Sequence, residues 1–322
     1  MVKRIDQDSL DHFQELLPQV RSIISKFYPQ DWNQFRPVME LLVSNPAGPL
    51  SVLPLASCSA AGGDAHEALY LAAAWRAYSQ AMRILDDVQD RDREGSLWAT
   101  AGNERAFNFG AALYVLCHQI LANADWPAER HRDISQMLSE TGIRLLSGQD
   151  RDLRGDTLTM DDYWQTIEQK NAAAFAFICA AGARCATENS SLIELCGTFG
   201  YHLGIILQLF DDYQGIWEPE GQGDLKLGKI TLPLLYGLSH EHDRKGELKS
   251  IVAADDLGQN ADRIREILDQ AGAREFMIWT ALQEQKQAIS TLKTLPGEQG
   301  VDILESYASA AFAHIDELLS AD

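Results

Sequence analysis

The sequence has few basic residues: 27 Lys and Arg stand against 47 Asp and Glu among 322 residues, for a formal net charge of −20. A chain this acidic is repelled by the phosphates of nucleic acids and by anionic membrane surfaces. No run of basic residues provides a local exception. The sequence therefore predicts no nucleic-acid partner. A small anion can still bind where metal ions mediate the contact.

Cysteine is also scarce, and no two cysteines form a C-x-x-C pair. The five cysteines lie in apolar helical stretches at Cys58, Cys117, Cys179, Cys185 and Cys196. This pattern is typical of buried free thiols in a reducing cytosol. The first residues lack the apolar segment of a signal peptide, and the longest apolar run, residues 172–183, is too short to span a bilayer. We therefore expect a cytoplasmic protein without stable membrane insertion.

Strand patterns are absent as well, because no segment alternates polar and apolar residues. Apolar residues recur instead at helical spacing, and clusters of Gly, Pro and Asp separate the segments. The predicted helices span residues 6–27, 34–44, 65–89, 103–123, 128–147, 161–186, 190–217, 230–240, 244–253, 259–272, 275–293 and 300–320. Since the connections are short, residues 1–322 are predicted to form one all-α domain, a single large helical bundle.

Three of the predicted helices are apolar nearly all round, within residues 65–85, 171–185 and 198–210. Helices of this kind belong in the middle of a large bundle. Their facing side chains can line a deep pocket.

The first acidic motif ends one of these apolar helices. Asp86 and Asp90 are four residues apart, and Asp87 and Asp90 are three apart. A helix therefore places all three carboxylates on one face. Three like charges on one face destabilise a helix unless water or cations surround them. Mg²⁺ is bound in proteins by one or two carboxylates together with water and substrate phosphates. The motif therefore indicates a magnesium site.

A second acidic pair, Asp211 and Asp212, follows another apolar helix. A single pair of this kind is also compatible with a solvated helix end. Two pairs, each at the end of a strongly apolar helix, are harder to explain as surface, because buried carboxylates need partners.

Lysines accompany these motifs. Lys226 and Lys229 lie beside glycines just before a predicted helix, which suits phosphate binding. Lys170 begins the apolar run of residues 171–185. Taken alone, Lys226 and Lys229 fit a solvated loop better than a binding site, and Lys170 is equally compatible with an exposed surface position.

Taken together, five motifs resemble the trans-isoprenyl diphosphate synthases over about residues 40–240. They are Asp-Asp-x-x-Asp, Gly-Gln-x-x-Asp-Leu, Lys-x-x-Ala-x-Phe, Gln-x-x-Asp-Asp and Asp-Leu-x-x-Gly-Lys-x-Thr-Leu-Pro, in this order. The resemblance implies an all-α isoprenoid synthase fold with a central cavity, a transferase activity, and a homodimer.

The resemblance also implies roles for individual residues. Asp86, Asp87 and Asp90 would hold two Mg²⁺ ions, and Asp211, in the motif that includes Asp212, would help to hold a third. Lys170 and Lys229 would contact an allylic isoprenyl diphosphate, and Gln208 would lie near the reacting carbon. The predicted catalytic residues are Asp86, Asp87, Asp90, Asp211, Asp212, Lys170 and Lys229.

Departures from the family pattern concern the second substrate, isopentenyl diphosphate. The segment that corresponds to the family's Gly-Gly-Lys-x-x-Arg-Pro is residues 48–54 and has no basic residue. Ser79 stands where the family has a histidine, and of two expected arginines only Arg93 matches. A dianionic substrate binds poorly without such groups. We therefore expect an acceptor other than isopentenyl diphosphate.

Residues 86–92, followed by Leu97 and Trp98, resemble one branch in particular, the quorum-sensing pheromone isoprenyltransferases, which prenylate a peptide tryptophan.

Two other departures from the family pattern lie near the metal motifs. Gly215 replaces the last aspartate of the second motif, and Arg83 lies on the face of the first, placed to pair with Asp87 or to touch the diphosphate.

The donor pocket is predicted from helical spacing below Asp86. Ala81 is small, Met82 is adaptable and Tyr78 lies a turn deeper, which predicts a donor of about fifteen to twenty carbons.

Three alternatives stay open from the sequence alone. A terpene-cyclase-like lyase would quench the cation internally or with water, although Gly215 and Pro219 break the usual cyclase motif. An ordinary polyprenyl diphosphate synthase with a divergent second-substrate site is another. A non-catalytic helical subunit would have no need of the first aspartate motif.

Overall fold

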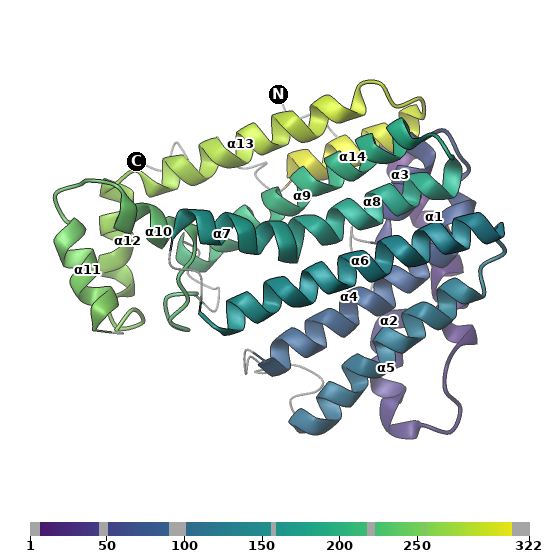
Figure 1. The fold of residues 1–322 in the computed structure, drawn as a ribbon, viewed down its shortest axis with the longest axis horizontal. Coiled ribbons are helices and arrows are strands. Elements are labelled where there is room, and N and C mark those ends of the chain that lie inside the picture. The colour runs from purple at the N-terminus through teal and green to yellow at the C-terminus, as the bar shows by residue number, and fades with distance from the viewer. Residues whose placement is uncertain are drawn as a thin grey trace.

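The computed structural model describes residues 7–44, 51–89, 101–155, 159–217, 223–254 and 256–310. Within these ranges every regular element is a helix, and none is a strand. Figure 1 shows long helices stacked roughly side by side, with a group of short helices at one end. The predicted all-α fold is confirmed.

The α-helices are α1 (Gln7–Lys26), α2 (Arg36–Ser44), α3 (Leu53–Ala60), α4 (Leu69–Gln89), α5 (Asn103–Ala122), α6 (Ala128–Leu153), α7 (Met160–Ile167), α8 (Ala173–Ala186), α9 (Ser190–Trp217), α10 (Leu232–Ser239), α11 (Lys245–Ala253), α12 (Ala261–Gln270), α13 (Ala273–Leu292) and α14 (Glu298–Ala310). The 3₁₀ segments η1 (Asn33–Phe35) and η3 (Ala65–Ala68) precede α2 and α4, and the π-helical segment η4 (Glu168–Ala172) joins α7 to α8.

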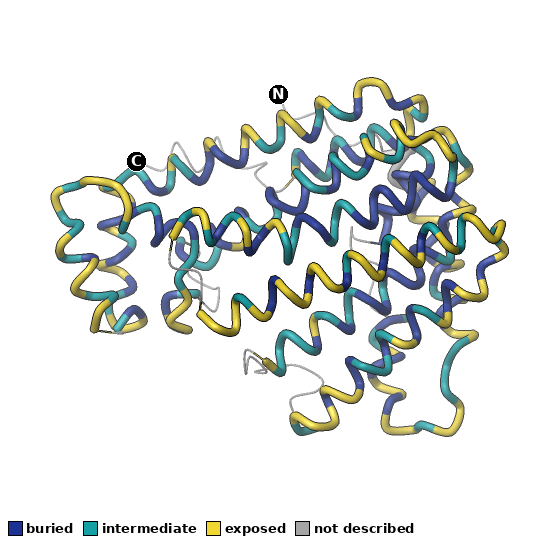
Figure 2. The backbone as a smooth tube through the Cα atoms, in the orientation of Figure 1, coloured by how far each residue is buried: buried dark blue, intermediate teal, exposed yellow. Residues whose placement is uncertain are grey.

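Helix α9 packs against η4, α8 and α13. Glycines allow the closest approach: a Cβ atom on Gly200 would lie 2.1 Å from the carbonyl oxygen of Phe175, and one on Gly204 would lie 2.8 Å from the Cα atom of Ala172. By length and composition α9 could cross a membrane, but it packs between α8 and α13, and 44 % of its most apolar stretch is buried in the bundle. Figure 2 shows buried and partly buried residues alternating along it. Its apolar surface therefore serves the core.

Helix α3 was not among the predicted helices. Most of its side chains are buried, and small residues let neighbours pack tightly against it. A Cβ atom on Gly182 would lie 2.5 Å from the Pro54 carbonyl oxygen, and one on Gly300 would lie 2.3 Å from that of Ala56. Pro54 lies in the first turn, where proline fits a helix. The short, evenly apolar sequence gave no helical periodicity to recognise.

The predicted helix at 161–186 is also divided. Helix α7 begins with a capping box between Thr159 and Asp162 and gives way to the π-helical segment η4, which precedes α8. Helix α6 continues past the predicted end at residue 147 to Leu153. Both differences bring residues of the predicted motifs onto helices that face one another.

A smaller apolar cluster lies apart from the main core, among α10, α11, α12 and the end of α9. These short helices lie at the left of Figure 1. The loop that follows α9 packs its Leu225 into this cluster. That contact anchors the lysine-containing turn next to the second aspartate motif.

Candidate active site

Lys170 joins three helical elements at one place. Its Nζ atom lies 3.2 Å from Oδ1 of Asp86 on α4 and 2.9 Å from Oδ2 of Asp152 on α6. Burial lowers the pKa of Lys170, but the two carboxylates outweigh it and leave the pKa above its usual value. The ammonium group therefore stays charged, and its position beside Asp86 suits an anion held together with metal ions.

Asp212 occupies a buried position, only 1 % exposed, on α9. The Tyr163 hydroxyl donates to its Oδ2 atom at 2.6 Å, the Gln208 side-chain amide donates to Oδ1 at 2.6 Å, and the Leu232 N–H donates to Oδ2 at 3.2 Å. Desolvation raises the pKa of Asp212 to about 7 despite these donors. Through these hydrogen bonds Asp212 connects α9 to α7 and to the start of α10.

The same network holds Gln208, because the Asn171 amide donates to the Gln208 Oε1 atom. Gln208 is therefore fixed at both ends of its side-chain amide, between the π-helical segment and Asp212. Lys170 and Asn171 are adjacent in that segment, so a single turn supplies both the ammonium group and the support of Gln208.

Asp211, adjacent to Asp212 on α9, is exposed. Desolvation raises its pKa, and the nearby charges of Lys229 and Lys170 oppose that rise. Desolvation also raises the pKa of Asp224 to about 6, with the charge of Asp211 adding to the effect and Lys229 opposing it. Two carboxylates and two lysines from three segments, namely α9, η4 and the turn after α9, thus share one electrostatic environment.

Other predicted residues lie around this centre. Asp87 is half-buried on α4, Arg83 is exposed, and among the described residues no ion pair joins Arg83 to Asp87. Lys226 and Lys229 are exposed in the turn after α9. Asp90 and Arg93, and also residues 48–50 of the second-substrate segment, lie outside the described residues.

The predicted pocket residues lie deeper on α4. Tyr78 is 1 % exposed, its ring stacks on Trp75 at 5.7 Å and meets Tyr114 at 5.9 Å, and Met82 is half-buried one turn above it. A Cβ atom on Gly142 of α6 would lie 3.7 Å from the Tyr78 hydroxyl oxygen. Trp75, Tyr78 and Tyr114 thus pack together on α4 and α5 below the first aspartate motif, and this cluster is called the aromatic floor.

The sequence did not single out four of the residues at this centre: Asp152, Tyr163, Asn171 and Asp224. Asp152, Asn171 and Asp224 lie within the family motifs given above. Their position in those motifs was the sequence feature that could have identified them. Tyr163 had none, because its role depends on a hydrogen bond across 49 residues.

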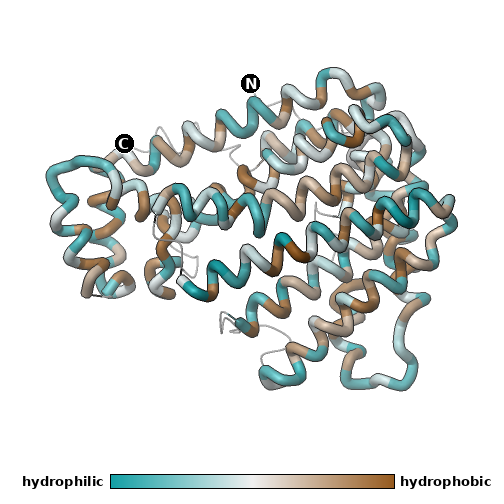
Figure 3. The backbone as a smooth tube through the Cα atoms, in the orientation of Figure 1, coloured by the Kyte–Doolittle hydropathy of each residue, from teal (hydrophilic) through white to brown (hydrophobic). Residues whose placement is uncertain are grey.

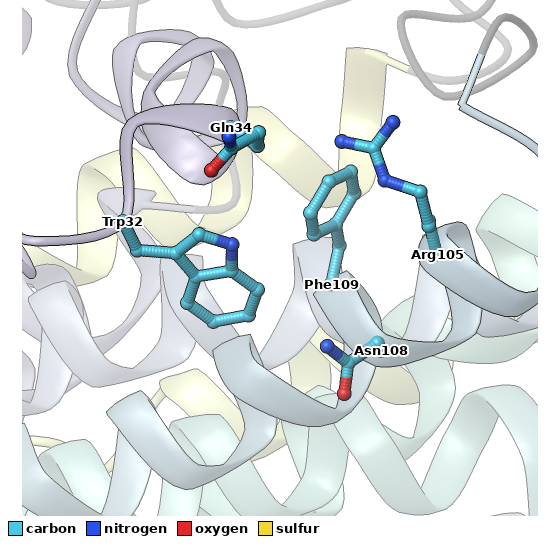
Figure 4. Close-up of a pocket in the computed structure, with 5 residues that line it drawn as sticks. All are labelled: Trp32, Gln34, Arg105, Asn108 and Phe109. Carbon is cyan, nitrogen blue, oxygen red and sulfur yellow. The ribbon is translucent and has the colours of Figure 1, made fainter.

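Two hollows lie elsewhere among the described residues. A cavity of about 410 Å³ lies between Trp32 and Gln34 of the N-terminal segment and the start of α5, with Arg105 and Phe109 on its other side (Figure 4). A groove of about 1360 Å³ runs between α6, α8 and α9. Neither is lined by a residue that the sequence analysis predicted for the site.

Comparison with known proteins identifies the family of this chain. The polyprenyl synthetase family pattern matches residues 35–271. A (2E,6E)-farnesyl diphosphate synthase of Mycobacterium tuberculosis is 28 % identical over 256 residues, which cover 74 % of this chain and 70 % of the relative. The tryptophan prenyltransferase ComQ of Bacillus spizizenii is 24 % identical over 202 residues, 61 % of this chain and 70 % of the relative.

Among solved structures, a polyprenyl synthase of Caulobacter crescentus, complexed with calcium and isoprenyl diphosphate, superposes with a TM-score of 0.84. The match covers 96 % of this chain and 98 % of that one at 23 % identity, which shows a common fold. The fold and the family match define an all-α prenyltransferase. The chain belongs to the polyprenyl synthetase family and is a transferase of the isoprenyl diphosphate synthase type.

Proposed function

We propose that this protein is a Mg²⁺-dependent prenyltransferase that ionises an allylic isoprenyl diphosphate and transfers the prenyl group to an acceptor other than isopentenyl diphosphate. The observation that carries the proposal is the position of Lys170 against Asp86, with Asp211 and Lys229 in the same electrostatic environment. This is a place for one diphosphate, held by lysines and by metal ions on carboxylates.

Magnesium fits these residues as a shared ligand of protein and substrate. In the described part of the chain, no three His, Cys, Asp or Glu side chains are grouped to hold a metal ion by themselves. Mg²⁺ commonly binds through one or two carboxylates and completes its shell with water and substrate phosphates. We propose that Asp86, Asp87, Asp90 and Asp211 share three ions with the bound diphosphate. The expected result of adding a chelator is loss of activity that Mg²⁺ restores.

The lysines and the aromatic side chains of the protein have different roles in this reaction. Lys170 and Lys229 bind oxygen atoms of the diphosphate and stabilise the charge that grows as it departs. Bound Mg²⁺ supplies further positive charge at the same oxygen atoms. The aromatic floor at Trp75, Tyr78 and Tyr114 holds the hydrocarbon chain away from water, so the allylic cation meets few nucleophiles other than the acceptor.

The surroundings of Ser79 support an acceptor other than isopentenyl diphosphate. Its hydroxyl is buried and has no hydrogen-bond partner among the described residues. Arg76, one turn earlier on α4, donates to the Leu42 carbonyl and to the Ser51 hydroxyl. This arginine therefore braces the start of α3, in the segment where the family pattern has its basic residues.

Relatives of this chain include both kinds of enzyme, farnesyl diphosphate synthases and a tryptophan prenyltransferase, so the acceptor needs a direct test. The protein is incubated with Mg²⁺ and allylic diphosphates of ten, fifteen or twenty carbons, each with and without isopentenyl diphosphate, and with a peptide that contains tryptophan. We expect a prenylated peptide and no gain from isopentenyl diphosphate. Efficient elongation would establish an ordinary synthase instead, and a hydrocarbon or alcohol formed without acceptor would establish a lyase.

The donor length is proposed from the aromatic floor. We expect Tyr78→Ala to accept a longer allylic diphosphate than the wild type, because it removes the ring that closes the pocket one turn below Met82. The matched control is Tyr70→Ala on the same helix. Competition between donors of different length measures the change, and an unchanged preference would reject this pocket.

A homodimer is proposed from exposed apolar side chains on two neighbouring helices. Five large hydrophobic residues are at least half exposed on α5 and α6, namely Phe107, Val115, Ile143, Leu146 and Leu153. Figure 3 shows the hydrophobic middle of α6. Exposed patches of this kind commonly mark protein interfaces. Ile143→Asp should shift the mass measured by light scattering from dimer to monomer.

A cytoplasmic location is proposed from the five cysteines, all free and buried. Fractionation of cells that produce the protein tests it.

A further inference from the structure

The groove of about 1360 Å³ runs along α8, with α6 on one side and α9 on the other. Its floor consists of the ring of Phe177 and of four small residues, Ala173, Ala176, Ala180 and Gly197. Small side chains let the axis of a neighbouring helix approach closely. Helix α8 has 14 residues and is about 21 Å long. The groove therefore has the length and the floor to receive one further helix of about four turns.

Carboxylates surround this floor. Six acidic residues line the groove, Glu129, Asp133, Glu140, Glu168, Glu188 and Glu194. Two of them are already paired, because the Nε atom of Arg184 donates to Asp133 at 3.0 Å and its Nη2 atom lies 3.9 Å from Glu188. Among the described residues, no lysine or arginine forms an ion pair with the other four. Arg144 is the second arginine of the lining, so negative charge predominates.

One end of the groove reaches the segment that carries Lys170. Glu168 and Gln169 of η4 line the groove, and Lys170, the next residue, belongs to the candidate active site. On α6, Arg144 of the groove precedes Asp152, the partner of Lys170, by about two helical turns, or about 12 Å. A peptide that lies in the groove can therefore continue past the end of α6 to the site.

The charge of the groove decides what kind of molecule fits it. A second copy of this chain is a poor occupant, because each copy has a formal net charge of −20. The face proposed for the dimer is also a different one: Thr141 of the groove and Ile143 of that face project about 160° apart around α6. A basic helix with small and apolar residues on one side complements both the carboxylates and the floor.

We propose that this groove binds a basic amphipathic helix in a peptide that presents the acceptor group. Its apolar side lies against α8, and its Lys and Arg side chains reach the carboxylates of α6 and α9. The inference rests on the proposed function, in which the acceptor is not isopentenyl diphosphate. It separates recognition of the acceptor from the chemistry, since the groove holds the peptide at a distance from the atoms that react.

The first experiment measures binding without turnover. The probe is a fluorescently labelled synthetic peptide, a helix of Ala, Leu and Lys of about four turns followed by a flexible linker and a Trp. Glu140→Lys/Glu194→Lys places one positive charge on each side of the groove and should weaken binding, measured by anisotropy, by about tenfold or more. The matched control is Glu15→Lys/Asp243→Lys, two exposed residues outside the groove, which should bind as the wild type does.

Two outcomes of this experiment would overturn the proposal. One is equal weakening by both double variants, because attraction to the overall charge would then account for binding. The other is equal binding of a probe in which Glu replaces every Lys.

The second experiment separates docking from chemistry. The prenylation of the helix-bearing peptide is compared with that of a short Trp peptide without the helix. We expect Glu140→Lys/Glu194→Lys to raise the KM of the longer peptide by about tenfold and to leave its kcat and the KM of the short peptide unchanged. Ala176→Met, which fills part of the floor without a change of charge, should also raise the KM of the longer peptide only. Unchanged KM values in both variants would contradict the proposal.

The two proposals fail in different ways. A wild-type protein that consumes no allylic diphosphate overturns the proposed function, whereas binding of the labelled probe is measured without that reaction. A wild-type protein that prenylates both peptides with equal KM overturns the assignment of the groove alone. A Glu140→Lys/Glu194→Lys variant that loses mass in light scattering would show that a second copy fills the groove, and would also overturn it.

Discussion

The two Asp-Asp pairs, at residues 86–87 and 211–212, are identical dipeptides in very different surroundings. Asp86 and Asp87 are both half-buried near the end of α4, and Asp86 faces Lys170. Asp211 is exposed, whereas Asp212 is enclosed by three hydrogen-bond donors. Adjacent residues point about 100° apart on a helix. Helix α4 ends at Gln89, so both members of its pair stay near solvent, while α9 continues to Trp217 and turns Asp212 into the core.

The difference shows that an identical dipeptide can keep both carboxylates near solvent in one place and bury one of them as a structural anchor in another. In the first pair Asp86 forms an ion pair with Lys170, and both carboxylates stay partly exposed. In the second pair the two residues differ in role. Buried Asp212 connects α9 to α7 and α10, and this holds in place the part of α9 that carries exposed Asp211.

The largest expected effect is that of Asp86→Ala on activity. Loss of this carboxylate removes metal ligation and one of the charges beside Lys170, so diphosphate release should fall by about 10³-fold. The free energy of unfolding should change little, because Asp86 is 40 % exposed. Release of pyrophosphate and urea denaturation measure the two quantities. A large loss of stability would show that the first pair is an anchor too.

Asp212→Ala should have its main effect on stability. It leaves the Tyr163 hydroxyl, the Gln208 amide and the Leu232 N–H without their acceptor, at a cost of about 3 kcal/mol. Asp211→Ala should stay within about 0.5 kcal/mol of the wild type, since it is an exposed substitution. Urea denaturation of the two variants tests the contrast directly. Equal losses would remove the distinction between ligand and anchor.

Tyr163→Phe should also lower the stability of the fold, but by less than Asp212→Ala does. It removes one donor to the buried Asp212 carboxyl group and should lower the free energy of unfolding by about 1.5 kcal/mol. The control is Tyr236→Phe, whose ring packs outside this network. A Tyr163→Phe variant as stable as the wild type would mean that the donors from Gln208 and Leu232 suffice.

The last expected effect concerns pH. The pKa of Asp212 is raised to about 7 in the folded protein, above the ordinary value of 3.8. The folded state therefore keeps this proton when the unfolded state has lost it, and the contribution to stability present below about pH 4 disappears as the pH rises through 7. Metal-free protein should unfold at a lower temperature at pH 7.5 than at pH 5. Asp212→Asn should show a weaker pH dependence, and an identical one would contradict the assignment.

Much of this arrangement could be predicted from sequence, for reasons that differ by residue. Asp86 and Asp211 follow strongly apolar helical stretches, which predicted carboxylates that need partners, and the family resemblance added that the two motifs lie at one site. Asp212 was predicted as catalytic, and its burial depends on contacts with α7 and α10 that no local pattern contains. Helix α3 was not predicted because it is short and seven of its eight residues are buried, so its sequence has no alternation of a polar and an apolar face.

The π-helical segment at residues 168–172 has a consequence for insertions and deletions. A π turn carries one residue more than an α turn, so the helix before it is rotated by about 100° relative to an unbroken α-helix. Deleting one residue between Glu168 and Ala172 would restore a regular helix and would rotate Tyr163 away from Asp212 while α8 stayed in register. This stretch should therefore tolerate changes of residue type far better than changes of length.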